Sequence, residues 1–346
     1  MLAPEHAAPE FALPEFDARA LLRRLAVPAL LAAFAAAFVL LAGGRIHAFA
    51  DAMRRGLDVS PSWAAMAGLF EFVSLAGYVG LLSLIAGRAT PRVGARESAQ
   101  ITLAGAAATR LLPTAGAGGV ALALWALRRA GLESRAATRT LLVFLIVLYS
   151  VFLGSIVVAG GMLALGLVHS DGPTELAAVP AVIAALGIGL CLGLASRPRA
   201  ESAGSRPKAG AQLVGDAVSE ACGLVRQRDP RLAGAIVYWA FDAAVLWAML
   251  HAFGSAPVLP AVVLAYFVGQ VANTLPIPGS VSGGMTGVLI AFAVPAEVAL
   301  PSVLAYRAVA VWLPSPVAVA AVPALRSTIA RWGREDAGRV SLAARP

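Results

Sequence analysis

Long apolar runs recur along the chain, separated by short polar segments. The continuous ones, each long enough to cross a bilayer as an α-helix, lie at 25–43, 63–87, 140–168, 176–195, 232–252 and 302–323. Apolar and polar residues do not alternate within them, so they favour membrane helices over the strands of a β-barrel. The pattern therefore predicts a polytopic α-helical membrane protein.

Two further apolar stretches are interrupted by proline and glycine. The first, 98–127, breaks at Leu112-Pro113-Thr114-Ala115-Gly116 and continues as Ala117-Gly118-Gly119. The second, 258–294, breaks at Leu275-Pro276-Ile277-Pro278-Gly279. Each half is too short to span alone, and broken backbone at membrane depth is tolerated only inside protein or beside a wet cavity. We expect each stretch to be a pair of half-helices.

Composition supports a membrane protein and excludes an ordinary soluble enzyme. Of the 346 residues 59% are hydrophobic and 13% are charged, whereas soluble domains carry about 25% charged residues. The mean hydropathy is +0.80. The net charge of +8 comes mainly from arginines at the ends of apolar runs, which is the pattern of cytoplasmic loops rather than of a nucleic-acid surface.

The positions of the arginines predict which loops are cytoplasmic. Basic clusters lie near residues 19–24, 88–96, 128–139, 197–231 and from 326 onward, whereas 169–175 and 253–260 carry no Lys or Arg. The basic segments should be cytoplasmic, which places both termini inside. Stretch 98–127 then enters and leaves on the cytoplasmic side, and 258–294 on the outside. Both are predicted to be re-entrant.

The order span, span, re-entrant pair, span thus occurs twice, from opposite sides of the membrane. Aligning the halves puts Arg110 on Asn273 and Leu112-Pro113 on Leu275-Pro276. The predicted fold is all-α with an inverted-topology repeat, a signature of secondary transporters. The predicted parts are an N-terminal tail at 1–24, a first membrane repeat at 25–168, a second repeat at 169–325 with a cytoplasmic interfacial linker at 196–231, and a basic cytoplasmic tail at 326–346.

Four ionisable residues fall inside the apolar segments: Glu71, Arg110, Asp242 and Arg307. Such residues are costly in a bilayer and usually mark a substrate or ion pathway. A guanidinium and glycine-rich helix N-termini suit a phosphate oxygen, so the two breaks are predicted to line one anionic head-group pocket. The alternative is that Arg110 and Arg307 simply neutralise Glu71 and Asp242. The predicted substrate-binding residues are Arg110, Pro113, Gly116, Gly118, Gly119, Asn273, Pro276, Pro278, Gly279, Ser282, Gly283, Gly284, Arg307, Glu71 and Asp242.

No motif for hydrolysis, nucleotide binding or metal binding occurs in the sequence. Cys191 and Cys222 give no disulfide framework or metal-ligand spacing. We expect no cofactor, no metal, no catalytic residues and no nucleic-acid partner. Without an ATPase domain, transport is driven by a gradient, is facilitated, or depends on a partner protein.

Several motifs resemble the lysylphosphatidylglycerol synthetase transmembrane (flippase-like) family. They are the second break with Gly283-Gly284, then Ala305-Tyr306-Arg307 and Trp312-Leu313-Pro314, and, near the first break, Leu111 to Gly119 with Arg128-Arg129-Ala130-Gly131. The similarity covers residues 20–325. It implies a translocase that moves phospholipid or glycolipid between leaflets, with inverted repeats around a central cavity.

The chain departs from that family at two places. Ser280, Ser282 and Gly287 stand where the family often has an acidic residue, and Val143-Phe144 where many members have Glu-Arg. Both argue against a cationic, lysine-bearing substrate. The residues after 325 are basic and polar, so we expect no synthetase domain. The alternative function is a non-transporting accessory subunit for a cell-envelope or lipid-modifying enzyme.

The arginine and alanine bias favours a bacterial plasma membrane, and the expected partner is a membrane lipid with an anionic phosphate head group. An intramembrane lipid-modifying enzyme would have only Glu71 and Asp242 as its acid or base. The sequence also leaves open a homo-oligomer or a partner protein from envelope biosynthesis.

Overall fold

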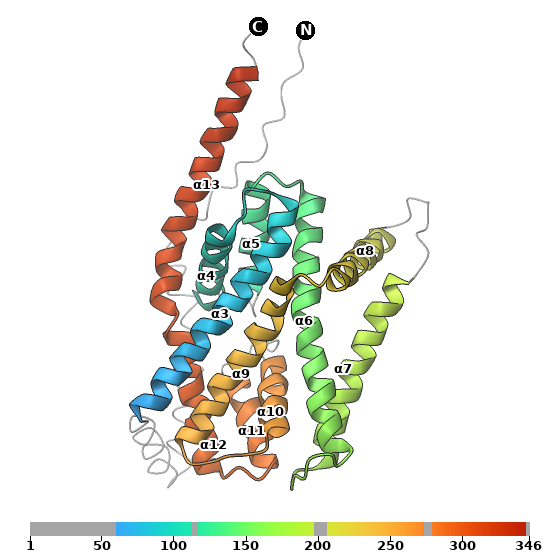
Figure 1. The fold of residues 1–346 in the computed structure, drawn as a ribbon, viewed down its shortest axis with the longest axis vertical. Helices are drawn as coiled ribbons and strands as arrows, with labels where there is room; N and C mark the ends of the chain where they lie inside the picture. Colours follow the sequence, from blue (N-terminus) through green and yellow to red (C-terminus); the bar gives the residue numbers. More distant parts are fainter. Residues whose placement is uncertain (1–59, 112–116, 197–205, 273–278, 344–346) are drawn as a thin grey trace. The chain divides into compact units, whose positions relative to one another are not determined.

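The computed structural model describes residues 60–343, apart from 112–116, 197–205 and 273–278 (Figure 1). Every regular element in these ranges is a helix. The bounds are α3 Pro61–Ala89, α4 Ala95–Leu111, α5 Ala117–Arg129, α6 Ser134–Ala164, α7 Thr174–Ala195, α8 Arg206–Arg226, a 3₁₀ turn η1 Pro230–Ala233, α9 Gly234–Ala252, α10 Leu259–Val271, α11 Ser280–Ala291, α12 Ala296–Arg307, a π-helical turn η3 Ala308–Trp312 and α13 Ser315–Ala343.

Five helical segments of this part of the chain are long and apolar enough to cross a membrane. They are Pro61–Ala89, Ser134–Ala164, Thr174–Leu194, Pro230–Ala252 and Ala296–Gly338. The fold is therefore all-α with the apolar helices of a membrane protein, as the sequence predicted. The predicted first span, 25–43, lies outside the described residues.

Helices α3 and α9 pack against each other along most of their length in an antiparallel arrangement. The ring of Trp63 near the start of α3 lies 6.0 Å from that of Trp247 near the end of α9. At the middle of α3, the Ser74 hydroxyl donates a hydrogen bond of 2.9 Å to the carbonyl of Tyr238. In the last turn of α3, Arg88 pairs with Asp229 ahead of α9. The two helices run side by side through the bundle (Figure 1).

Glycine allows α3 and α9 to approach closely where they cross. A Cβ atom added to Gly77 would lie 2.8 Å from the carbonyl oxygen of Gly234 and 2.9 Å from the backbone nitrogen of Tyr238. Both neighbours are backbone atoms, so neither can rotate away. Small residues at such crossings are typical of membrane helix pairs, where close van der Waals contact drives association.

We expect Gly77→Ala to destabilise the protein by about 1–3 kcal/mol, the usual cost of overpacking a close contact. Gly80, one turn further along α3, is the matched control, because a Cβ there meets no atom within 4 Å. Gly80→Ala should be neutral or slightly stabilising, since alanine is the better helix former. Thermal unfolding in detergent measures both variants. Equal stability of the two would contradict the close α3–α9 crossing.

The two interrupted apolar stretches form two helical hairpins, α4–α5 and α10–α11. Helix α4 packs against α5, α3 and α13, whereas α10 packs against α11, α9 and α6. Each hairpin is thus enclosed by longer helices rather than lying apart from the bundle (Figure 1). The predicted division of both stretches into half-helices agrees with the helix bounds on either side of 112–116 and 273–278.

The predicted span 302–323 lies within Ala296–Gly338, which is long and apolar enough to cross a membrane, but its backbone is not one uninterrupted α-helix. Helix α12 ends at Arg307, a π-helical turn follows at Ala308–Trp312, and α13 begins at Ser315. Pro314 between them has no backbone N–H to donate to the preceding turn. Helix α13 then continues to Ala343 through residues that the sequence predicted to be a polar tail.

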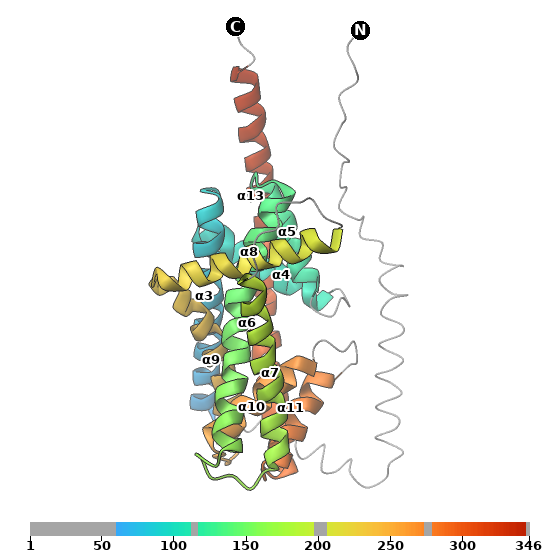
Figure 2. The same cartoon turned by 90° about the vertical axis from the view of Figure 1, so that its right-hand side faces the viewer.

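The linker between the predicted repeats contains an amphipathic helix, α8. It packs across α6 and α7 (Figure 2). Ala217, Val218, Ala221 and Leu224 are buried there, whereas Val225 is 59% exposed. An ion pair of 2.6 Å between Arg139 of α6 and Glu220 of α8 adds to this contact.

Charged side chains gather at one end of the bundle. Ion pairs join Arg88 to Asp229, Arg92 to Asp336, Arg139 to Glu220 and Arg331 to Glu97. Arg92 and Asp336 also hydrogen-bond, and that contact raises the pKa of the Arg92 guanidinium. The loops at the other end, 165–173 and 253–258, contain no Lys or Arg. The bundle is therefore polarised along its helices in the way that the sequence predicted.

Candidate functional site

Two acidic side chains are buried in the apolar bundle. Glu71 of α3 is 5% exposed and Asp242 of α9 is 7% exposed. They lie on α3 and α9, the two helices that pack against each other most extensively. Buried carboxyl groups are costly among apolar membrane helices, so each of them is a candidate functional residue.

Two fully buried tyrosines donate hydrogen bonds to Asp242. The Tyr266 hydroxyl of α10 donates to Oδ2 of Asp242 in a short contact. The Tyr306 hydroxyl of α12 lies 3.3 Å from the same oxygen. Gln270, one turn after Tyr266, donates from Nε2 to both phenolic oxygens, at 3.3 and 3.1 Å. The carboxylate of Asp242 thus ends a chain of donors that begins at Gln270.

Three helices therefore contribute to one buried polar network, which we call the carboxyl–tyrosine network. Its members are Asp242, Tyr266, Gln270 and Tyr306. Buried polar groups of this kind are stable only when their hydrogen bonds are satisfied, because desolvation is costly in apolar surroundings. The rings of Trp239 and Phe267 pack against the ring of Tyr266.

Arg307 lies beside the network at the point where α12 changes to a π-helix. Its positive charge acts on Asp242 and on Tyr306. Within the described residues Asp242 receives its hydrogen bonds from Tyr266 and Tyr306, so Arg307 acts on it through charge without a hydrogen bond. π-Helical turns are rare and often occur at functional sites. The guanidinium is half-buried and retains donors for another anion.

The start of α5 is held against α4 by contacts between small residues. A Cβ on Gly119 would lie 2.8 Å from Oγ1 of Thr109 and 3.1 Å from the carbonyl oxygen of Gly105. The Thr109 hydroxyl accepts a hydrogen bond from the backbone N–H of Gly119 and donates one to the carbonyl of Gly105. The sequence predicted that backbone amides at this helix start would bind a phosphate. The amide of Gly119 is instead hydrogen-bonded to Thr109.

The start of α11 is arranged differently. Gly279 precedes it with φ of 82°, a left-handed conformation that glycine adopts without strain. The Ser280 hydroxyl donates a hydrogen bond of 2.8 Å to the carbonyl of Ala272 at the end of α10, across the break. Gly284 packs near Gly269 of α10. These contacts fix how α11 leaves α10.

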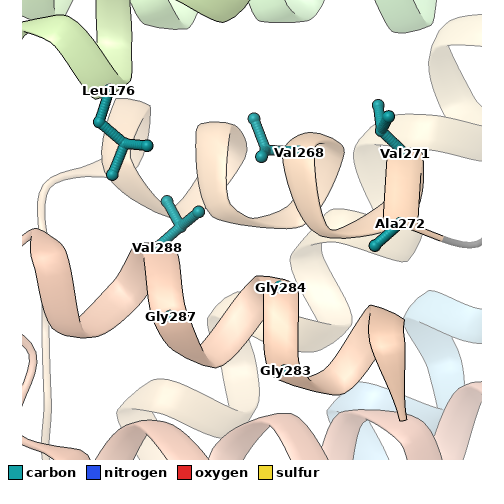
Figure 3. A pocket seen from close by; sticks show the side chains of 8 residues that line it. All are labelled: Leu176, Val268, Val271, Ala272, Gly283, Gly284, Gly287 and Val288. Atoms are coloured by element: carbon teal, nitrogen blue, oxygen red, sulfur yellow. The ribbon is translucent and has the colours of Figure 1, made fainter. Parts of the chain in front are cut away.

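A groove of about 520 Å³ lies between α7, α10 and α11 (Figure 3). Three glycines, one alanine and four larger aliphatic side chains form its walls, and Gly283 and Gly287 are exposed in it. Val268, Val271 and Ala272 of α10 face the groove, whereas Tyr266 and Gln270 lie on the opposite face of that helix, as helical periodicity requires. Helix α10 thus separates an apolar groove from the carboxyl–tyrosine network.

The structure brings some of the predicted site residues together and separates others. Glu71, Asp242 and Arg307 lie in one cluster. Gly283 and Gly284 line the groove on the other face of α10, and Ser282 is half-buried on α11. Gly118 and Gly119 begin α5, and Gly279 precedes α11. Pro113, Gly116, Asn273, Pro276, Pro278 and the side chain of Arg110 lie outside the described residues.

The sequence did not predict the tyrosines that bind Asp242. Tyr266 and Tyr306 lie in apolar helices, and neither they nor Gln270 were among the predicted site residues. The spacing of Tyr266 and Gln270, one helical turn apart inside an otherwise apolar helix, is the signal that identifies a shared polar face.

No protein-family model matches this chain, and a comparison with curated proteins gives no match either. Evidence for its function therefore comes from the arrangement of its own residues.

Proposed function

We propose that the protein is a lipid translocase that moves a phospholipid or glycolipid between membrane leaflets, without an ATPase or synthetase domain. The observation that carries this proposal is the carboxyl–tyrosine network with Arg307 beside it, buried among apolar membrane helices. Ionisable residues in such places usually line a substrate or ion pathway. A soluble substrate or a structural role would not need the other features described next.

The packing of the hairpins supports an inverted repeat with two re-entrant pairs. In the first half, α4 contacts α3, α5 and α13; in the second, α10 contacts α9, α11 and α6. The first-half helices α3 and α6 then correspond to α9 and to α12 with η3. In keeping with this, α3 contacts η3 and α9 contacts α6. The antiparallel α3–α9 pair fits halves of opposite orientation, the arrangement of many transporters.

The groove beside α10 supports a substrate with an acyl chain. Its walls are aliphatic side chains and glycines, and Val271 on its rim is 48% exposed. An apolar groove at the surface of a membrane bundle suits hydrocarbon, whereas Arg307 suits a phosphate oxygen. In this arrangement the phosphate of the lipid lies toward Arg307 and its acyl chain lies along the apolar groove.

We place the protein in a bacterial plasma membrane with both termini in the cytoplasm. The arginine-rich end of the bundle supports this orientation, since positive charge marks the cytoplasmic side. The motifs at 111–131, 275–284 and 305–314 support membership of the lysylphosphatidylglycerol synthetase transmembrane family. The residues at 143–144 and 280–287 still argue against a lysine-bearing lipid.

The test is lipid movement by the purified protein in liposomes. A trace of head-group-labelled anionic phospholipid is quenched from outside with dithionite. In protein-free vesicles about half of the label is lost, since the two leaflets of a bilayer are nearly equal in area. In vesicles that contain the protein the loss should approach completion. Equal quenching in both kinds of vesicle, over several anionic lipids and imposed gradients, would favour the accessory subunit instead.

Filling the groove should slow this movement about tenfold, equivalent to about 1.4 kcal/mol. Gly287 lines the groove and a Cβ there meets no atom within 4 Å, so Gly287→Leu places its side chain in the groove without an internal clash. Gly189 of α7 is equally open but does not line the groove, which makes Gly189→Leu the matched control. Equal rates for both variants would exclude the groove from the lipid path.

A further inference from the structure

Serine hydroxyls in the long apolar segments donate hydrogen bonds to backbone carbonyls. Ser74 of α3 donates to a carbonyl of α9. Ser150 and Ser155 of α6 donate to carbonyls of their own helix, and so does Ser302 of α12. Within the described residues, no fully enclosed hydroxyl oxygen of the five segments that could cross a membrane lacks a partner. This is expected, because an unpaired hydroxyl among apolar groups is costly.

Three other hydroxyl oxygens in the described part of the chain are fully enclosed and have no hydrogen-bond partner in the protein. Ser98 and Thr102 belong to α4, and Thr286 belongs to α11. The side chain of Ser98 is 0% exposed. Native interiors contain few unpaired polar groups, and each calls for ordered water, an ion or a functional role. All three lie on half-helices of the two hairpins, which indicates that α4 and α11 contact polar groups from outside the protein.

The hydroxyls of α4 lie on the face of this helix that meets α5. Gly105 lies close to Gly119 of α5, and Thr109 is hydrogen-bonded to the same residue. Ser98 and Thr102 each lie seven positions, or two turns, before one of these two α4 residues, so all four share one face. From Ser98 to Thr109 the helix rises about 16 Å, about half of the ~30 Å hydrocarbon core of a bilayer. The hydroxyls of α4 therefore extend from the arginine-rich end of the bundle to its middle.

Helix α11 continues in the other half of the bundle. Phe292, directly after α11, packs against Gly172 in the loop 165–173, which carries no Lys or Arg. The helix therefore ends at the face opposite to the arginine-rich one. Thr286 lies one turn after Ser282, a second hydroxyl that is half-buried. Helices α4 and α11 thus carry hydroxyls in opposite halves of the membrane.

Arg307 lies between these halves in depth. Helix α12 begins at Ala296, shortly after Phe292, and Arg307 is its last residue, about 16 Å further in. Helix α12 packs against α11. A charged group is thus present at mid-depth, where a phosphate loses most water, with neutral hydroxyls toward either side.

We propose that the hydroxyls of α4 and α11 hold water inside the bundle and form the polar path of the lipid head group. This inference rests on the proposed function and names the residues that the head group passes. A hydroxyl both donates and accepts hydrogen bonds, so it binds water between lipids and a phosphate or sugar oxygen as a lipid passes. Neutral hydroxyls also bind weakly enough for the head group to leave again, which any conducting path requires.

Thiol labelling tests for the water without any transport. The full-length protein with Cys191→Ala and Cys222→Ala lacks its own thiols, and one cysteine is then introduced at a time. In lipid nanodiscs, where both membrane faces are open to reagents, each variant is exposed to an anionic methanethiosulfonate. A thiol reacts through its ionised form, which needs water around it. Ser98→Cys, Thr102→Cys and Thr286→Cys should all be labelled.

Ser302→Cys is the matched control for this labelling. Ser302 is also 0% exposed, but its hydroxyl donates to the carbonyl of Val298 and needs no water. This variant should stay unlabelled over the same time. Because cysteine and serine are similar in size, the variants should fold, and positions on two helices give independent readings. No labelling at any of the three positions, or equal labelling of Ser302→Cys, would overturn the proposal.

The path itself is tested by removing one hydroxyl and following lipid movement with dithionite. Thr102→Val should slow the movement about tenfold, the lower end of what the loss of a hydrogen bond to a charged group costs. Thr102→Ser keeps the hydroxyl and should retain the wild-type rate. Thr138→Val, the matched control, should retain it too, because the Thr138 hydroxyl donates to the carbonyl of Ser134 in its own helix.

The outcomes separate the path from the proposed function. A wild-type rate in Thr102→Val would overturn the path and leave the translocase intact. Equal losses in Thr102→Val and Thr102→Ser would also overturn it, because the hydroxyl would then not be the cause. If the wild-type protein moves no lipid, the proposed function fails together with the path, and the labelling still decides whether α4 and α11 hold water.

Discussion

Arg307→Gln is expected to slow the movement of anionic lipid about 10- to 150-fold, the range that corresponds to a lost charge-assisted hydrogen bond of about 1.5–3 kcal/mol. The guanidinium stands at the junction of α12 with the π-helical turn, with charge available beside Asp242. Glutamine keeps a polar side chain of moderate length but offers neither the charge nor the fork of donors that fits a phosphate. The dithionite assay measures the rate.

Arg326→Gln is the matched control for this variant. Arg326 is also an arginine of the C-terminal helical region, but it is exposed at the basic end of the bundle. Its replacement should leave the rate within about twofold, because exposed charges contribute little. The loss in Arg307→Gln should be smaller for a zwitterionic lipid. A similar loss for anionic and zwitterionic lipids would mean that Arg307 supports the fold rather than the head group.

The positions and lengths of the membrane helices could be predicted from the sequence because their physical cause is local. Continuous apolar residues need to be buried or to face lipid, and each of the described predicted spans matches a helix within a few residues. The predicted span 302–323 also lies within a segment long and apolar enough to cross a membrane, Ala296–Gly338. Its interruption at Pro314 and the π-helical turn was not predicted, because hydropathy averages over the run and ignores its backbone.

The sequence also predicted which ionisable residues lie inside the apolar runs, but it did not predict which side chains they contact. Glu71 and Asp242 are buried as predicted. The partners of Asp242 come from other helices: Tyr266 of α10 and Tyr306 of α12 donate hydrogen bonds to it. Nothing local in the sequence specifies how these helices meet. The alternative in which Arg110 and Arg307 neutralise Glu71 and Asp242 stays a prediction, because the side chain of Arg110 lies outside the described residues.

The tyrosines escaped prediction for a related reason. A tyrosine in an apolar helix is normally read as a packing or interface residue, because its ring is apolar and its hydroxyl can face water. Tyr266 and Tyr306 come from different helices and meet only in the folded bundle. The predicted head-group pocket between the two breaks stays a prediction, since 112–116 and 273–278 lie outside the described residues.

The buried network gives a second large effect, on stability. Asp242→Leu should destabilise the protein by about 2–6 kcal/mol, because it removes the acceptor of two fully buried phenolic O–H groups. Gln270 still donates to both phenolic oxygens, but each O–H then lacks an acceptor, at about 1–3 kcal/mol. Asp242→Asn should cost much less, since its side-chain carbonyl still accepts a hydrogen bond. Reversible unfolding in detergent measures both variants.

The decisive comparison is with the triple variant Asp242→Leu, Tyr266→Phe, Tyr306→Phe. It contains the same leucine, so any strain from the new side chain is equal in the two proteins. It lacks the two orphaned hydroxyls, and Gln270 is half-buried and can bond to water instead. Replacing both partners of a buried hydrogen bond is often nearly neutral, whereas removing one is costly. The triple variant should therefore recover most of the stability that Asp242→Leu loses. If it is instead less stable than Asp242→Leu, the phenols contribute through packing, and Asp242 is not the acceptor that holds α10 and α12 against α9.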